Sequence, residues 1–167
     1  KIQENGLRAF ARAHHKTGVP IAIHSYHPGQ IARRQIAILK EEGVDLKRVK
    51  IDHANDTTDV EYLIWILEQG CFLGLDRYPG GGTSPMARTK TLKALIDAGY
   101  ADRLCPSHDG SLAYILPDGF TRQLYESRNP HRFLYMKKVV FPWLRQMGVK
   151  EAVISNLCVT GPRNFFE

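Results

Sequence analysis

The stretch PIAIHSYHPG (residues 20–29) is an apolar run that ends in a histidine and then breaks at Pro28-Gly29. A short apolar run bounded by turn residues predicts a buried β-strand. A polar ring at the end of such a strand has two interpretations. Either His24 is a core histidine that a neighbour satisfies by hydrogen bonding, or the end of the strand faces a site. In the second case, other parts of the chain should supply partners for it.

The same order of strand and helix recurs along the chain. The predicted strands lie at residues 18–25, 47–55, 71–78 and 102–110, and helical periodicity is found at 29–43, 56–70, 86–100 and 131–148 as well as before residue 18. This alternation predicts an α/β fold with a parallel sheet, which is either open and doubly wound or closed into a barrel.

Local signals mark where these helices begin, end or bend. Glycines follow three of the helical stretches, at Gly43, Gly70 and Gly99. A glycine in this position is typical of a helix C-terminus. Asp56 or Thr57 is the expected N-cap of the helix at 56–70. Pro142 is expected to kink or divide the last helix, because proline lacks the N–H that a helix interior needs.

Composition excludes several classes of protein. The 167 residues are 43% hydrophobic and 24% charged, as in an ordinary globular domain, and we treat residues 1–167 as one domain. No apolar run approaches the roughly 20 residues that span a bilayer, and the first residues are too polar for a secretory signal. We therefore expect a soluble, cytoplasmic protein without a membrane partner.

Charge and cysteine content refine this expectation. The net charge of +6 is spread along the chain without a basic block, so a nucleic-acid partner is not expected, although anionic substrates would be mildly favoured. Cys71, Cys105 and Cys158 form no CxxC pair and each lies among apolar residues. They are typical of reduced core thiols in a reducing compartment.

Polar side chains stand at the carboxyl end of every predicted strand. They are His24, His53, Asp76 with Arg77, and His108 with Asp109. In parallel α/β folds these ends lie together on the face that binds ligands. Each residue alone has an ordinary explanation, such as a cap or a surface ion pair. Together, two imidazoles and a carboxylate form a ligand set suited to Zn²⁺, Mn²⁺, Co²⁺ or Fe²⁺.

The glycine-rich segment PGGG (residues 79–82) raises a different hypothesis, a loop that binds phosphate. The sequence contains neither GxGxxG nor GxxxxGK[ST], so a flexible connection between a strand and a helix is the favoured interpretation. An open-sheet protein that binds nucleotides through this loop remains an alternative.

Five segments, taken in order, resemble the C-terminal half of the phosphotriesterase family within the amidohydrolase superfamily. They are GVPIAIHS (18–25), KIDHANDTTDVEYL (50–63), GCFLGLDRY (70–78), LIDAGYADRLCPSHD (95–109) and VTGPRNFFE (159–167). GLDRY followed by SHD resembles the lactonase branch of the family. The resemblance implies a TIM-type (β/α)₈ barrel of which this chain carries roughly the last four βα units.

The resemblance also implies roles for individual residues. His24 and His53 would bind one metal ion, while Asp109 would bind the second and take part in proton transfer. Arg77 and Tyr78 would lie beside the substrate. The implied cofactors are two divalent ions, with zinc the first expectation and cobalt, manganese or iron the alternatives. His27 and His108 would not be ligands. Possible acceptors for the second ring nitrogens of the histidines are Asp52 and the NDTTD stretch at 55–59.

The sequence departs from the family pattern in three ways. The HxH pair and the bridging lysine precede the matched region, the chain contains no HxH, and Lys1 is poorly placed to be that lysine. A full barrel takes about 250 residues, so this chain is expected to be part of a longer polypeptide or a truncated product. Gly110 stands where relatives carry an aromatic residue, and this change is expected to enlarge the pocket.

The implied activity is that of a binuclear-metal hydrolase acting on ester bonds. A hydroxide that bridges the metals would attack a small-molecule lactone, an organophosphate triester or both. The loop at 111–130 is expected to cover the pocket, its alternative being a packing surface for a neighbour or a second copy in a homodimer. The alternative function is a non-catalytic half-barrel that binds metal weakly or serves as an assembly partner.

Overall fold

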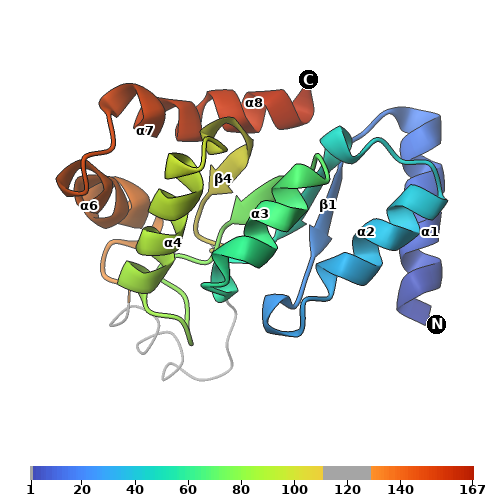
Figure 1. Cartoon of the computed structure of the whole chain (residues 1–167), viewed down its shortest axis with the longest axis horizontal. Helices are drawn as coiled ribbons and strands as arrows, with labels where there is room; N and C mark the ends of the chain where they lie inside the picture. Colours follow the sequence, from blue (N-terminus) through green and yellow to red (C-terminus); the bar gives the residue numbers. More distant parts are fainter. Residues whose placement is uncertain (1, 111–128) are drawn as a thin grey trace.

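A computed structural model describes residues 2–110 and 129–167 of the chain (Figure 1). Within these residues four short strands form one parallel sheet in sequence order: β1 (Ile21–His24), β2 (Val49–Asp52), β3 (Phe72–Leu75) and β4 (Leu104–Pro106). In the register of the ladders, Ile21 pairs with Val49, Lys50 with Phe72, and Leu73 with Leu104. The predicted α/β fold with a parallel sheet is therefore confirmed. The described sheet is open, and β1 and β4 form its edges.

The helices follow the strands in alternation. They are α1 (Ile2–Thr17), α2 (Ala32–Glu41), α3 (Val60–Glu68), α4 (Pro85–Asp97), α6 (Phe141–Gln146), α7 (Glu151–Cys158) and α8 (Thr160–Phe166). Helices α2, α3 and α4 lie over one face of the sheet (Figure 1). None of the helices within the described ranges is both long enough and apolar enough to cross a membrane.

The two faces of the sheet differ in burial. On the helix-covered face of β1 and β2, Ile21, Val49 and Ile51 are almost completely buried and belong to the main hydrophobic core. On the opposite face, Ala22 and His24 are exposed. Because strand side chains alternate between faces, this second face is the one that would line the interior of a closed barrel. The structure thus shows a half-barrel whose inner face is exposed along β1, whereas all four residues of β3 are buried.

Helix α8 lies across the opposite end of the sheet from the carboxyl ends of the strands (Figure 1). The Phe165 ring packs against Phe72 at the start of β3, with 5.6 Å between ring centroids. Arg48, just before β2, donates a hydrogen bond to the carbonyl of Phe166 at 3.3 Å. The amino ends of the strands are therefore covered, and the carboxyl ends are left for a ligand.

Two predictions about helix ends had different outcomes. Gly43, Gly70 and Gly99 all have positive φ, at 73°, 106° and 91°, and follow α2, α3 and α4 as predicted. The predicted N-cap of α3 was wrong. Asp59 caps α3 by accepting a 3.0 Å hydrogen bond from the N–H of Tyr62. Asp56 is engaged by two arginines instead, as described below.

The predicted division at Pro142 is confirmed. A 3₁₀ turn at Arg132–Leu134 leads into a π-helix at Met136–Val140, and α6 begins at Phe141. Pro142 therefore falls in the first turn of α6, at the point where the π-helix gives way to an α-helix.

The three cysteines are all free, but they do not share one environment. Cys71 is completely buried, Cys105 is partly buried and Cys158 is exposed. The prediction of three core thiols was thus wrong for Cys158. Helix α7 buries Ile154 and Leu157, and the next residue along falls on its solvent side.

We predict that iodoacetamide labels Cys158 of the folded protein well before Cys71. Burial raises the pKa of Cys71 to about 12, so this thiol is neither ionised nor accessible at pH 8. Peptide mass spectrometry after timed labelling measures the order, and Cys158→Ser is the control that should remove the fast phase. Equal labelling rates for Cys71 and Cys158 would contradict the described core.

Candidate metal centre and substrate pocket

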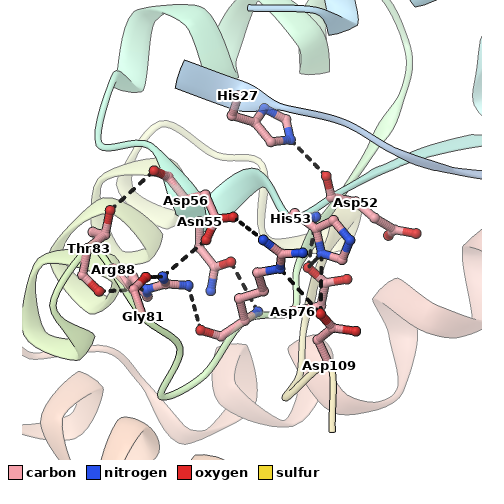
Figure 2. A network of polar contacts seen from close by, with 11 residues as sticks. His27, Asp52, His53, Asn55, Asp56, Asp76, Gly81, Thr83, Arg88 and Asp109 are labelled. Carbon is pink, nitrogen blue, oxygen red and sulfur yellow. Dashed lines mark hydrogen bonds and ion pairs between the residues drawn. The ribbon is translucent and has the colours of Figure 1, made fainter. Parts of the chain in front are cut away.

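Of the polar residues predicted at the strand ends, His53, Asp76 and Asp109 lie close together (Figure 2). His24 ends β1, His53 follows β2, and Asp109 follows β4. The rings of His24 and His53 meet edge to face, with 4.3 Å between centroids. His53 Nδ1 lies 4.0 Å from Asp109 Oδ2. The structure therefore gathers all three predicted metal ligands at the carboxyl edge of the sheet.

Asp76 holds His53 through two contacts. Asp76 Oδ1 accepts a 2.8 Å hydrogen bond from the backbone N–H of His53 and lies 3.1 Å from its ring Nδ1. Because a carboxylate oxygen accepts, Nδ1 carries the proton, and the lone pair of Nε2 is left to act as a ligand. His53 takes a left-handed conformation, with φ of 64°. Such strain is typical of functional sites.

Sequence reasoning missed the role of Asp76. Asp52, one of the acceptors it considered, forms an ion pair with Lys50 at 2.9 Å instead. Burial raises the pKa of Asp76 and the charge of Asp52 adds to this, whereas His53 lowers it. The position of Asp76 at the end of β3, next to His53 across the parallel ladder, was the signal that could have identified it.

Arg77 bridges two carboxylates. Its Nη1 donates to Asp56 Oδ2 at 2.6 Å and its Nε donates to Asp109 Oδ2 at 3.2 Å. Burial by itself would lower the pKa of Arg77, but hydrogen bonds and charges from Asp56 and Asp109 outweigh it and raise the pKa. The guanidinium therefore stays charged and orients Asp109 without exchanging protons with it.

The glycine-rich loop is folded around a buried arginine. Arg88 of α4 is completely buried and donates hydrogen bonds to the carbonyls of Arg77, Gly81 and Thr83. A phosphate-binding loop turns its N–H groups towards the ligand, whereas here three carbonyls face a cation. The geometry thus opposes the phosphate-loop hypothesis. Gly80 is required at this point, because its φ is 66° and a Cβ would lie 2.7 Å from the Arg88 guanidinium.

His27 and His108 are engaged by backbone groups. The buried His27 donates from Nε2 to the carbonyl of Asp52 at 2.8 Å, and burial lowers its pKa. Nε2 of His108 accepts a 3.3 Å hydrogen bond from the N–H of Met136, and burial lowers its pKa as well. That neither ring is a metal ligand stays a prediction. His27 also fixes the backbone immediately before His53.

A cavity of about 380 Å³ opens beside Asp109. Its lining residues are Asp56, Arg77, Tyr78, Pro79, Gly80, Gly81, His108, Asp109 and Asn129. The Arg77 side chain is about one third exposed. Tyr78 is only 1% exposed and belongs to the hydrophobic core, so its ring supports the wall of the cavity. Of the two predicted substrate contacts, Arg77 is the accessible one.

The expected opening at Gly110 is filled. A Cβ at this position would lie 2.8 Å from the ring of Phe133. The 3₁₀ turn at Arg132–Leu134 brings this phenylalanine in from elsewhere in the chain. The expectation that glycine enlarges the pocket here was therefore wrong, because an aromatic side chain from another segment occupies that space. The predicted covering loop lies almost entirely outside the described residues, as does Lys1.

The donor set fits part of a transition-metal site. His24 and His53 offer imidazole nitrogens, and Asp109 offers a carboxylate that is half exposed. Within residues 2–110 and 129–167, however, no group of three or more histidine, cysteine, aspartate or glutamate side chains is arranged to hold a metal ion alone. The described residues thus supply an incomplete ligand set that would need further donors.

Comparison with known proteins gives a consistent result. The model of the "Phosphotriesterase family" matches residues 1–166. A phosphotriesterase homology protein of Mycobacterium tuberculosis (strain H37Rv) is 36% identical over 166 residues, which cover 98% of this chain and 50% of that protein. An aryldialkylphosphatase of Saccharolobus solfataricus is 34% identical over 169 residues, covering 99% of this chain and 53% of that protein.

Structural comparison agrees. A solved structure of the phosphotriesterase from Mycobacterium tuberculosis superposes with a TM-score of 0.90 at 35% sequence identity, over 98% of this chain and 50% of that one. An N-acetyltaurine hydrolase of Dictyostelium discoideum is 28% identical over 96% of this chain and 44% of its own length. The chain spans about half the length of the relatives that it matches.

We predict that Asp76→Asn weakens binding of Zn²⁺ by about 10- to 100-fold, because the amide no longer fixes the His53 ring as a carboxylate does. Titration against a chromophoric chelator measures the affinity. Asp97→Asn, which removes an exposed carboxylate on α4, is the matched control and should have no effect. Unchanged affinity in Asp76→Asn would contradict the assignment of Asp76 as the acceptor that orients His53.

Proposed function

The chain belongs to the phosphotriesterase family and carries about half of its (β/α)₈ barrel, and from this premise we propose that it forms part of a metal-dependent hydrolase. Two relatives are named for hydrolysis, as an aryldialkylphosphatase and an N-acetyltaurine hydrolase. We propose lactones, organophosphate triesters or both as substrates of this protein. GLDRY followed by SHD, at 74–78 and 107–109, favours lactones.

The observation that carries the proposal is the convergence of His24, His53 and Asp109, with His53 oriented by Asp76. In this proposal the two histidines hold one divalent ion and Asp109 holds the second. The ions are zinc, or alternatively cobalt, manganese or iron. When bound, they would activate water near neutral pH and polarise the oxygen of the substrate. The remaining ligands would come from the half of the barrel that this chain does not supply.

Asp109 is the proposed proton acceptor. Its side chain is about half exposed and lies at the cavity, and its Oδ2 is fixed by Arg77 Nε. No described residue donates a hydrogen bond to its Oδ1, so this oxygen is available to take a proton. Arg77 cannot accept that proton, because guanidinium remains charged. The proposed role of Arg77 is to orient Asp109 and to contact the substrate, with Tyr78 supporting the wall behind it.

The next prediction concerns a version of this protein that is extended towards its N-terminus. In this extended protein, we predict that Asp109→Asn lowers kcat by roughly 10²- to 10⁴-fold, since the amide cannot accept the proton. Arg77→Met is expected to lower kcat and to raise KM, because Asp109 loses its anchor and the substrate loses a donor. Initial rates on a γ-lactone and on a dialkyl aryl phosphate measure both effects, with Asp97→Asn as the control. Full activity in Asp109→Asn would refute its assignment as proton acceptor.

A second candidate is a non-catalytic half-barrel that binds metal weakly or serves as an assembly partner. It is favoured by the exposure of Ala22 and His24 on the side of β1 that would face the interior of a barrel. The incomplete ligand set within the described residues also favours it. The homodimer expected from the sequence stays a prediction, which light scattering of the purified protein would test.

Metal content separates the two candidates. We predict that the chain alone binds fewer than two equivalents of Zn²⁺ and hydrolyses neither substrate, whereas a version extended towards the N-terminus binds two equivalents and is active. Elemental analysis and initial rates on matched preparations provide the test. If the extended protein binds two ions and is inactive on both substrates, the proposed hydrolase activity on lactones and triesters is wrong.

A further inference from the structure

Arg88 is a fully buried cation on α4, whose other buried side chains are uncharged: Thr89, Thr91, Leu92 and Leu95. Its side chain is 0% exposed, and its neighbours Leu92 and Leu95 on α4 belong to the hydrophobic core. Burying a guanidinium is costly unless its donors are satisfied, and an apolar side chain of similar volume often serves stability as well or better. Stability of the core therefore gives a poor reason for an arginine at this position.

The partners of Arg88 all belong to the two loops that border the cavity. Its Nε donates to Thr83 O at 3.0 Å and its Nη2 to Gly81 O at 2.7 Å, while Nη1 donates to the carbonyl of Arg77. Nη2 also lies 3.0 Å from Asp56 Oδ1. Four contacts thus tie the loop after β2 to the loop after β3. Arg88 itself does not line the cavity.

These contacts hold Arg77 at both its backbone and its side chain. The carbonyl of Arg77 accepts from Arg88, and its N–H donates to Asn55 Oδ1 at 3.1 Å. Asp56 uses one oxygen for Arg88 and the other for Arg77. Arg77 in turn reaches Asp109 through Nε. A chain of alternating charges therefore runs from Arg88 to the cavity.

The exposed fraction of the side chain increases along this series of four charged residues. The side chains of Arg88, Asp56, Arg77 and Asp109 are 0%, 21%, 34% and 49% exposed. Charges interact more strongly where water is excluded, so the buried end is the fixed point and the cavity end is the part that it holds in place. The planar fork of an arginine satisfies these acceptors in several directions, which a lysine ammonium cannot reproduce.

We propose that Arg88 is a positioning residue: through Asp56 and the carbonyl of Arg77, it holds the Arg77 guanidinium against Asp109. The inference rests on the proposed function for what the cavity binds, but the placement of Arg77 can be tested without turnover. Loss of Arg88 should release the Arg77 side chain while leaving the sheet intact.

The test measures hydrogen exchange of the Arg77 Nε–H by ¹⁵N NMR, with the signal assigned by its absence in Arg77→Lys. In Arg88→Met and in Arg88→Lys, exchange is expected to accelerate by about tenfold or more, because the bond to Asp109 opens more often. Leu92→Ala is the matched control, since it opens a core cavity on the same helix and leaves the four contacts of Arg88 in place. Its Arg77 exchange should match that of the parent protein.

Unchanged exchange in folded Arg88→Met would overturn the proposal, and so would equal acceleration in Leu92→Ala. If Arg88→Met does not fold, Arg88→Lys decides the question. Lysine keeps the positive charge but cannot reach the three carbonyls and Asp56 at once, so Arg77 should still be released. Unchanged exchange in Arg88→Lys would overturn the proposal.

Kinetics of the extended protein provide a second readout. Arg88→Lys should impair kcat and KM in the same direction as Arg77→Met, whereas Leu92→Ala should leave both unchanged below its unfolding temperature. Normal kinetics in Arg88→Lys would count against the proposal. An inactive parent protein would refute the proposed function alone, because the exchange measurement still decides the role of Arg88.

Discussion

His24 pairs with Asp52 in the parallel ladder between β1 and β2, and this register sets the rest of the site. Parallel strands end on one edge, so the residue after β2 lies next to the last residue of β1. The same rule brings Asp76 beside His53, and Asp109 to within 4.0 Å of the His53 ring. Helix α8 covers the opposite edge, which leaves the carboxyl edge as the place for a ligand.

Charge then determines how this edge is ordered. Two arginines and three carboxylates take part: Asp56 follows β2, Asp76 and Arg77 follow β3, Arg88 is on α4 and Asp109 follows β4. Each of these carboxylates has a defined partner. Asp76 orients His53, Asp56 is shared by Arg88 and Arg77, and Asp109 is held by Arg77. The buried end of this network is the least hydrated, so it gives a fixed reference for the more exposed groups at the cavity.

The strand positions and the predicted ligands could be read from the sequence because apolar runs and strand ends follow a simple period. Features that depend on which distant groups meet after folding could not be predicted from the sequence. Asp56 is a plausible N-cap by position, but two arginines engage it and Asp59 caps α3 instead. Space at Gly110 is filled by Phe133, which lies more than twenty residues further along. Cys158 lies on the solvent side of α7, because the burial of Ile154 and Leu157 sets which side of that helix faces the core.

By itself, the sequence determined the α/β class, the order of its elements, the family, and the residues that stand at the strand ends. These follow from local periodicity and from motifs. Only the tertiary structure decided that Asp76 is the acceptor for His53, and that Arg88 closes the glycine-rich loop with its carbonyls inward. The physical reason is that hydrogen bonds and ion pairs form between groups brought together by folding, and several acceptors competed for each donor.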